Sequence, residues 1–323
     1  MVIPCATIIP FHNRLEQVAD LLSELLPDTP ETAKIILVDD GGDSEAKDDP
    51  ALHKFRGDGR LVFLRHQLNA GAASARNTGI SWCRKNGVDI VILLDSDCLP
   101  EPGFIATHLD LHKRLSDIAC IGGGIRGVGS GFWSRVDCIM SWFTSVPESR
   151  ERVVLEPMHI PSTNMSLKLS RVRDEEVFDP RFKTGEELVV LKNLRKSGEK
   201  IMFSPIPVVT HRDREGPWAV LRHQFSWALH TYTIRVGRIR DKKWLRLVFA
   251  LAFLAGLPLF AVYATYLNMK PWVETDLGKL AYSPVVLMIY VFKGVGVILG
   301  ALNPSLALNP VPSDKEPDQA SGL

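Results

Sequence analysis

The stretch IVILLDSD at residues 90–97 decides how the rest of the chain is interpreted. Its first five residues form an unbroken apolar run, as expected of a β-strand that is buried on both faces of a parallel sheet. Two aspartates, Asp95 and Asp97, follow at once, with the small residue Ser96 between them. Such a carboxylate pair suits a hard divalent cation, Mg²⁺ or Mn²⁺, that is shared with phosphate oxygens.

The sequence before residue 90 shows the same pattern, an apolar run followed by acidic residues. Short apolar runs alternate with stretches of helical spacing, and one such helix, from about residue 70 to 85, follows Asn69 as a plausible cap. Asp39 and Asp40 follow the apolar run at 35–38. Aspartate is common in turns after strands, but two acidic pairs after successive apolar runs favour one polar site at one edge of the sheet. The alternation predicts an α/β fold with a largely parallel sheet and crossover helices.

Bulk properties exclude some classes of protein. The chain has 323 residues, with 38 Lys and Arg against 37 Asp and Glu. The net charge is therefore close to zero and does not indicate nucleic acid as a partner. Five cysteines are widely spaced and odd in number, which makes a disulfide framework or a structural zinc site unexpected.

Several short motifs together resemble family 2 of the inverting glycosyltransferases, which have the GT-A fold. They occur in the order of that family over roughly residues 3–215: IIPFHN (8–13), VDDGG (38–42), NAG (69–71), ARNTG (75–79), LLDSD (93–97), STNMS (162–166), FDPRF (178–182) and GEEL (185–188). The resemblance implies a nucleotide-sugar donor, a hydroxyl acceptor such as a saccharide, and a divalent metal. It does not name the sugar. The aromatic residues at 132–143 and 218–232 suggest an acceptor that is lipid-linked or presented at a membrane, with core packing of the first stretch as the alternative.

The resemblance also assigns roles to individual residues. It implies that the nucleotide-sugar contacts Pro10, Asn13, Asp39, Asp40, Asn69, Arg76, Asp95 and Ser96. The metal would be bound by Asp97, with Asp95 and His211 as further candidates, although a lone histidine after a strand is more often an ordinary surface residue.

An inverting transfer needs a general base for the acceptor hydroxyl. In the family this is the second acid of a Glu-Asp pair that opens a helix, and here the pair is Glu186 and Glu187. Glutamate is one methylene longer than aspartate, so the base could be either residue. The alternative is that both glutamates only favour a helix N-terminus.

After residue 215 the chain changes character. An amphipathic helix and a basic linker are expected over 216–244, followed by two transmembrane or membrane-embedded helices over 245–302 and a disordered tail over 303–323. The basic residues before the first apolar segment favour a membrane, with the catalytic domain (1–215) in the cytosol and two crossings of the cell membrane. Lys293 interrupts the second segment, which could therefore be re-entrant or interfacial, and two buried helices of a soluble protein are the remaining alternative.

Other functions are weighed against transfer of one or a few sugars. A processive polysaccharide synthase of this family carries Gln-x-x-Arg-Trp, but this chain has Gln224-Phe225-Ser226-Trp227 and lacks the many helices of a polymer channel. A nucleotidyltransferase would favour a Gly-rich phosphate loop with a basic signature near the N-terminus, and neither is seen in this sequence. A non-catalytic nucleotide-sugar-binding membrane protein would have no need of the acidic pair at 186–187.

Overall fold

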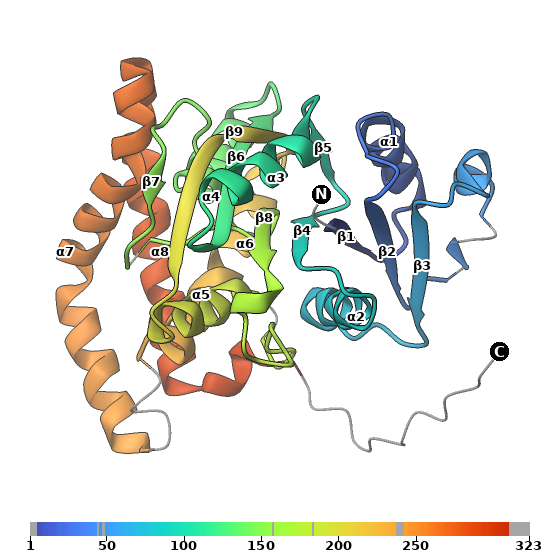
Figure 1. Cartoon of the computed structure of the whole chain (residues 1–323). Helices are drawn as coiled ribbons and strands as arrows, with labels where there is room; N and C mark the ends of the chain where they lie inside the picture. The colour runs from blue at the N-terminus through green and yellow to red at the C-terminus, as the bar shows by residue number, and fades with distance from the viewer. Residues whose placement is uncertain are drawn as a thin grey trace.

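A nine-stranded mixed sheet forms the centre of the computed structural model, which describes residues 5–43, 45–46, 49–156, 158–182, 184–236 and 242–309 (Figure 1). The strands are β1 (Cys5–Phe11), β2 (Lys34–Asp40), β3 (Leu61–His66), β4 (Ile90–Leu94), β5 (Cys98–Pro100), β6 (Ile118–Val128), β7 (Arg152–Val153), β8 (Asn164–Lys168) and β9 (Lys200–Arg212). The α-helices are α1 (Leu15–Leu25), α2 (Ala72–Lys85), α3 (Phe104–Arg114), α4 (Phe132–Trp142), α5 (Glu186–Lys196), α6 (Pro217–Thr231), α7 (Lys243–Thr275) and α8 (Ser283–Leu302).

The strand order is β3-β2-β1-β4-β8-β6-β9-β5, and β7 pairs with β9. Strands β1 to β4 run parallel, whereas β8 is antiparallel to both of its neighbours. Side chains of α1, α3 and α4 pack on one face of the sheet, and those of α2 and α5 pack on the other. The predicted α/β architecture with a mostly parallel sheet is therefore confirmed, and the carboxyl ends of β1, β2 and β4 lie side by side.

The predicted cap of α2 was wrong. The helix begins at Ala72, and its N-cap is Gly71 in a positive-φ conformation (φ 88°) without a side-chain cap. The Asn69 side chain instead accepts a hydrogen bond from the Gly71 N–H at 3.2 Å. The reason is that Asp40 holds the backbone of this loop, which delays the start of the helix.

The last two helices form an antiparallel hairpin against the side of the sheet domain (Figure 1, orange and red). Both α7 and the segment that contains α8 are long and apolar enough to cross a membrane. Side chains of both helices also join the apolar core on the α1, α3 and α4 face of the sheet, among them Trp272 and Ile289. The helix predicted over 216–244 is α6, and its apolar residues Phe225 and Leu229 lie against α8.

The chain returns to the sheet domain after α8. Leu308 bridges to Phe182, and the Asn309 side chain donates to the Pro180 carbonyl at 2.8 Å. The predicted disordered tail therefore begins with an ordered stretch up to residue 309. The rest of that tail, and residues 237–241 of the predicted basic linker, lie outside the described residues.

Candidate active site

An open cleft lies at the carboxyl ends of β1, β2 and β4, with a volume of about 340 Å³. Its walls bring together six of the eight predicted nucleotide-sugar residues and the predicted metal ligand Asp97. The lining residues are Pro10, Phe11, His12, Arg14, Asp40, Asn69, Gly71, Ala72, Arg76, Asp95, Ser96 and Asp97. Elements far apart in the sequence thus meet at one polar edge of the sheet.

Asp40 fixes the backbone of the wall that precedes α2. Its carboxylate accepts hydrogen bonds from the Ala70 and Gly71 N–H groups at 2.9 and 2.8 Å, and it also contacts His66 Nδ1 at 2.8 Å. Burial raises the pKa of Asp40, but these hydrogen bonds and the charge of His66 outweigh it, so the pKa lies below its usual value. The charged Asp40 carboxylate therefore fixes the backbone of this wall of the cleft.

Asn13 and Asp39 were predicted to contact the nucleotide, but they lie outside this lining. Asn13 has a positive φ of 54°, and its side chain accepts from the Asp43 N–H at 2.7 Å. Asp39 is buried and accepts from the Gly42 N–H at 2.9 Å. A Cβ at Gly42 would lie 2.9 Å from the Asp39 carboxylate, which explains why glycine fits here. These residues shape the turn beside the cleft.

Arg76 joins the two acidic groups of the site. This buried guanidinium on α2 donates to Asp95 Oδ1 at 2.7 Å and to Glu186 Oε1 at 2.5 Å. Asp95 also accepts from the Thr163 hydroxyl at 2.8 Å. Burial raises the pKa of Asp95, but Arg76 and Thr163 outweigh it and hold the pKa below its usual value. One arginine thus connects the end of β4 to the start of α5.

The two glutamates of α5 differ sharply in their surroundings. Glu186 is paired with Arg76, whereas Glu187 is buried and its Oε1 has no hydrogen-bond partner. Burial and then the negative charge of Glu186 raise the pKa of Glu187 to about 8. A carboxyl group with a pKa near the working pH can exchange a proton with a substrate, which is the property of a general base.

His211 lies next to Asp97, although it is not among the residues that line the cleft. His211 Nε2 lies 3.8 Å from Asp97 Oδ1, and His211 Nδ1 lies 3.1 Å from Asp213 Oδ1. Burial lowers the pKa of His211, but the hydrogen bond to Asp213 and the charge of Asp97 outweigh it, so the pKa is raised. The Trp142 indole N–H donates to the same Asp213 oxygen at 2.9 Å, which fixes this carboxylate.

These residues fit a divalent cation. The carboxylate and the imidazole nitrogen present ligand atoms to a common space, and Asp213 orients the histidine as a carboxylate commonly orients a metal-bound histidine. The described residues contain no cluster of three or more His, Cys, Asp or Glu side chains that could hold a metal, so a cation here would have only two protein ligands. A site with two protein ligands suits Mg²⁺ or Mn²⁺, which fill their remaining positions with substrate oxygens and water.

Sequence reasoning missed three contributors to this site. Arg14, which opens α1, donates to Asp97 Oδ2 at 2.6 Å. Asp213 and Trp142 position His211. The His-x-Asp spacing at 211–213 could have predicted the contact between His211 and Asp213. The contact of Arg14 with Asp97, 83 positions away in the sequence, could not be predicted from a local pattern.

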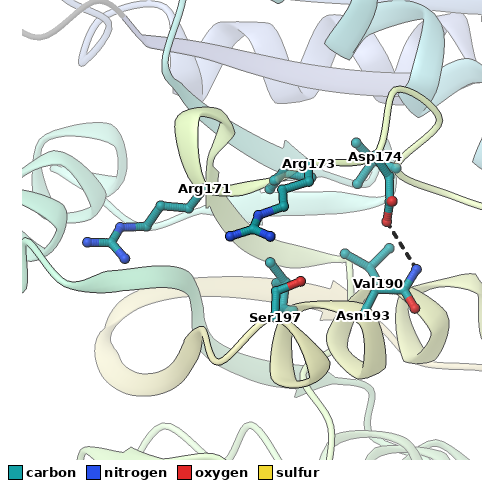
Figure 2. Close-up of a pocket in the computed structure, with 9 residues that line it drawn as sticks. Arg171, Arg173, Asp174, Val190, Asn193 and Ser197 are labelled. Atoms are coloured by element: carbon teal, nitrogen blue, oxygen red, sulfur yellow. Dashed lines mark hydrogen bonds between the residues drawn. The ribbon is translucent and has the colours of Figure 1, made fainter.

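A second, much smaller pocket of about 20 Å³ lies between residues 171–174 and α5 (Figure 2). The Asn193 amide donates across it to Asp174 at 3.1 Å. This pocket has room for about one water molecule and shares no lining residue with the cleft.

Comparison with known proteins agrees with this site. The family model of glycosyl transferase family 2 matches residues 6–173. A pre-mycofactocin glycosyltransferase of Mycobacterium tuberculosis is 26% identical over 212 residues, which cover 64% of this chain and 42% of that protein. An uncharacterized glycosyltransferase of Rickettsia conorii is 31% identical over 122 residues, which cover 33% of this chain and 19% of its own. This chain therefore spans less than half the length of these curated relatives.

Two solved structures share the fold. GalNAc-T7, crystallised with UDP, GalNAc and Mn²⁺, aligns with a TM-score of 0.51 and 16% identity over 72% of this chain and 52% of its own. TarS of S. aureus aligns with the same TM-score and identity over 72% of this chain and 40% of its own. At this identity the likeness supports the GT-A fold alone.

Proposed function

The chain belongs to glycosyl transferase family 2, and on that premise we propose that it transfers a sugar from a nucleotide-sugar to an acceptor hydroxyl at the described cleft. The observation that carries this proposal is the bridge through Arg76, which connects Asp95 at the donor cleft to the Glu186-Glu187 pair. A site that only binds nucleotide-sugar would not need a buried carboxyl group of raised pKa beside the donor.

Two groups of residues would bind the donor. The loop at 69–71 and Asp95 would hold the nucleotide, while Asp97 and His211 would hold Mn²⁺ or Mg²⁺ against the diphosphate. A metal there supplies positive charge to the leaving group. The other residues on the nucleotide side would be Pro10, Asp40, Arg76 and Ser96, with Asn13 and Asp39 supporting the turn beside the cleft.

Glu187 is the proposed general base. The acceptor oxygen forms a bond to the anomeric carbon as the bond from that carbon to the diphosphate oxygen breaks, and the hydroxyl proton moves to Glu187. This single displacement would invert the anomeric configuration. Glu186 is the less suitable base because its carboxylate is already paired with Arg76.

The other sequence-based alternative was a processive polysaccharide synthase. Gln224 of the incomplete Gln-x-x-Trp string accepts a hydrogen bond from Lys293 at 2.7 Å, and its amide nitrogen lies 3.3 Å from the Ser141 hydroxyl. These contacts occupy Gln224 in packing between helices, and the missing arginine of the motif favours transfer of one or a few sugars.

Association with a membrane is suggested by α7 and α8, and we place the enzyme at the cytosolic face of the cell membrane. An acceptor carried by a lipid or a saccharide chain at that surface fits the aromatic residues at the starts of α4 and α6. Phe132, at the start of α4, stacks on Tyr282 before α8, and Trp218 at the start of α6 is 78% exposed. Two crossings of the membrane were the expectation from sequence.

A panel of nucleotide-sugars incubated with detergent-solubilised protein tests the transfer. We expect release of nucleoside diphosphate from one donor, and a product whose anomeric configuration by NMR is opposite to that of the donor. Retained configuration would contradict the role of Glu187 as a base. Binding of a donor without turnover, across acceptors that include lipid-linked saccharides, would favour a nucleotide-sugar sensor.

A further inference from the structure

The α7–α8 hairpin is fastened to the catalytic domain near both ends of α7. Near the start of the helix, Phe249 packs on the buried ring of Tyr232, with 4.9 Å between the ring centroids. Tyr232 begins the short helix Tyr232–Val236, whose Ile234 carbonyl accepts from Lys192 of α5 at 3.0 Å. Near the other end of α7, the Trp272 indole N–H donates to the Ile139 carbonyl of α4 at 3.0 Å.

These two attachments are far apart along the helix axis. Residue 249 and residue 272 lie roughly 35 Å apart at 1.5 Å per residue. The hydrocarbon core of a bilayer is about 30 Å thick. If α7 crossed a bilayer, the catalytic domain, which contacts α7 at both of these places, would lie beside the helix at the depth of the hydrocarbon with its charged groups. Burying those charged groups in lipid is strongly unfavourable.

Helix α8 is docked on α6 along much of its length. Lys293 Nζ donates to Gln224 Oε1 at 2.7 Å, which satisfies the one charge in this helix. Further along, a Cβ at Gly296 would lie 2.7 Å from Ala228 Cβ, and one at Gly300 would lie 2.2 Å from the Leu229 carbonyl oxygen. Such close approach of the two backbones holds α8 beside α6, so α8 cannot cross a bilayer unless α6 enters it as well.

The outward faces of the hairpin are nevertheless apolar. Exposed residues recur every three or four positions, as on one stripe of each helix. We call this stripe the lipid-facing surface; it includes Leu251, Leu259 and Tyr266 of α7, and Met288, Val295 and Leu299 of α8. An exposed apolar surface that extends along two helices marks an interaction site.

Charge and aromatic residues identify the partner as a bilayer. Lys242 and Lys243 lie at the start of α7, whereas at its other end Lys270 pairs with Glu274 at 3.9 Å and Asp276 lies nearby. The cations at the start of α7 favour anionic headgroups at that end of the helix. Trp244 is 64% exposed at the start of α7, and tryptophan favours the membrane interface.

We propose that the α7–α8 hairpin lies in the plane of the membrane surface, with the lipid-facing surface in the headgroup region and both ends of α7 on the side of the catalytic domain. This rests on the membrane attachment that is part of the proposed function. It replaces the two crossings expected from sequence with a single-sided attachment, in which the cleft opens beside the lipid that would carry the acceptor.

Labelling of single introduced cysteines in sealed membrane vesicles of known orientation tests the proposal. The positions are Lys243→Cys and Leu277→Cys at the two ends of α7, with Glu24→Cys on the exposed side of α1 as the reference for the catalytic domain. Four of the five native cysteines are buried, and burial raises the pKa of the half-buried Cys138 to about 12, so unmodified protein provides a low background.

An in-plane hairpin predicts that a membrane-impermeant maleimide labels all three cysteines from the same side of the vesicle. If α7 crosses, Leu277→Cys loses its labelling from the side that labels Glu24→Cys and gains it from the opposite side, which overturns the proposal. Recovery of the unmodified full chain in the soluble fraction, without binding to vesicles of anionic lipid, overturns it as well.

A depth measurement separates the two arrangements independently. Fluorescent labels at Leu251, Leu259 and Tyr266 should be quenched equally by a nitroxide near the lipid headgroup and weakly by one near the chain end. Stronger quenching of position 259 by the chain-end nitroxide would indicate a crossing helix. Donor hydrolysis in detergent does not depend on this orientation, so loss of the membrane proposal and loss of the transferase proposal would be distinguishable.

Discussion

The donor cleft and the C-terminal hairpin are organised by opposite means. The cleft is held by charged groups that are paired across the sheet edge, with Arg76 between Asp95 and Glu186 and with His211 between Asp97 and Asp213. The hairpin is held by close packing, with glycines of α8 against α6 and only a few polar contacts. Ion pairs fix the positions of individual atoms, which a catalysed reaction requires. An apolar surface determines only which face of the hairpin is turned toward lipid.

The largest effect is expected from Glu187, the buried acid beside the Arg76 bridge whose Oε1 has no hydrogen-bond partner among the described residues. Glu187→Gln should lower the transfer rate about a thousandfold, because a positioned general base contributes about 10²- to 10⁴-fold. Donor affinity should change little, since the amide keeps the shape of the side chain. The comparison variant Asp110→Asn, on the exposed side of α3, should leave the rate unchanged. A normal rate in Glu187→Gln would transfer the base role to another group.

The same variant should change how stability depends on pH. Because the pKa of Glu187 is raised from 4.5 to about 8 in the folded protein, the folded state binds the proton more tightly than the unfolded state. Stability is then full below about pH 4.5 and is lost as the pH rises toward 8. Glu187→Gln should remove this loss, so that its Tm exceeds that of the unmodified protein at pH 8 but not at pH 4.5. Equal Tm differences at both pH values would argue against a buried Glu187.

A smaller effect tests the bridge through Arg76. Arg76→Lys keeps the charge, but one ammonium cannot replace the two-sided contact of the guanidinium with Asp95 and Glu186. We expect a loss of transfer of about a hundredfold or more, since a small misplacement of reacting groups can cost that much. The control is Lys85→Ala, an exposed residue at the end of the same helix. Unchanged kinetics in Arg76→Lys would mean that the bridge has no role in aligning donor and base.

The next prediction concerns metal affinity. Asp213→Asn should weaken Mn²⁺ binding about 10- to 100-fold, because loss of a carboxylate that orients a metal-bound histidine has this effect. Titration of Mn²⁺ followed by EPR measures this without turnover. Glu215→Gln, two residues further on and exposed, serves as the matched control. Identical Mn²⁺ affinity of both variants would remove His211 from the proposed metal site.

The smallest effect concerns the packed hairpin. Gly300→Ala places a methyl group where the Leu229 carbonyl oxygen would be 2.2 Å away, so we expect a loss of stability of about 1–3 kcal/mol. Gly256→Ala, which meets no atom within 4 Å in α7, should be neutral or slightly stabilising. Thermal unfolding in detergent compares the two. Equal Tm values would mean that α8 is not docked on α6.

The sequence predicted the cleft better than the hairpin, for a physical reason. The strand at 90–94 ends directly before Asp95 and Asp97, so a local pattern placed both carboxylates at the sheet edge. The partner of Asp97, Arg14, comes from a distant element and could be found only from the fold. Likewise, the apolar segments indicated helices of suitable length, but the contacts of Trp272 with α4 and Lys293 with α6 depend on tertiary packing.

Metal-dependent hydrolysis of the donor is the decisive test of the proposed site. The nucleotide-sugar selected from the panel is incubated with full-length protein in detergent, with Mn²⁺, with Mg²⁺ or with EDTA, beside the variants Asp97→Asn and Asp110→Asn. We expect nucleoside diphosphate release that requires metal, persists in Asp110→Asn and disappears in Asp97→Asn. Release that continues unchanged in EDTA and in Asp97→Asn would contradict it.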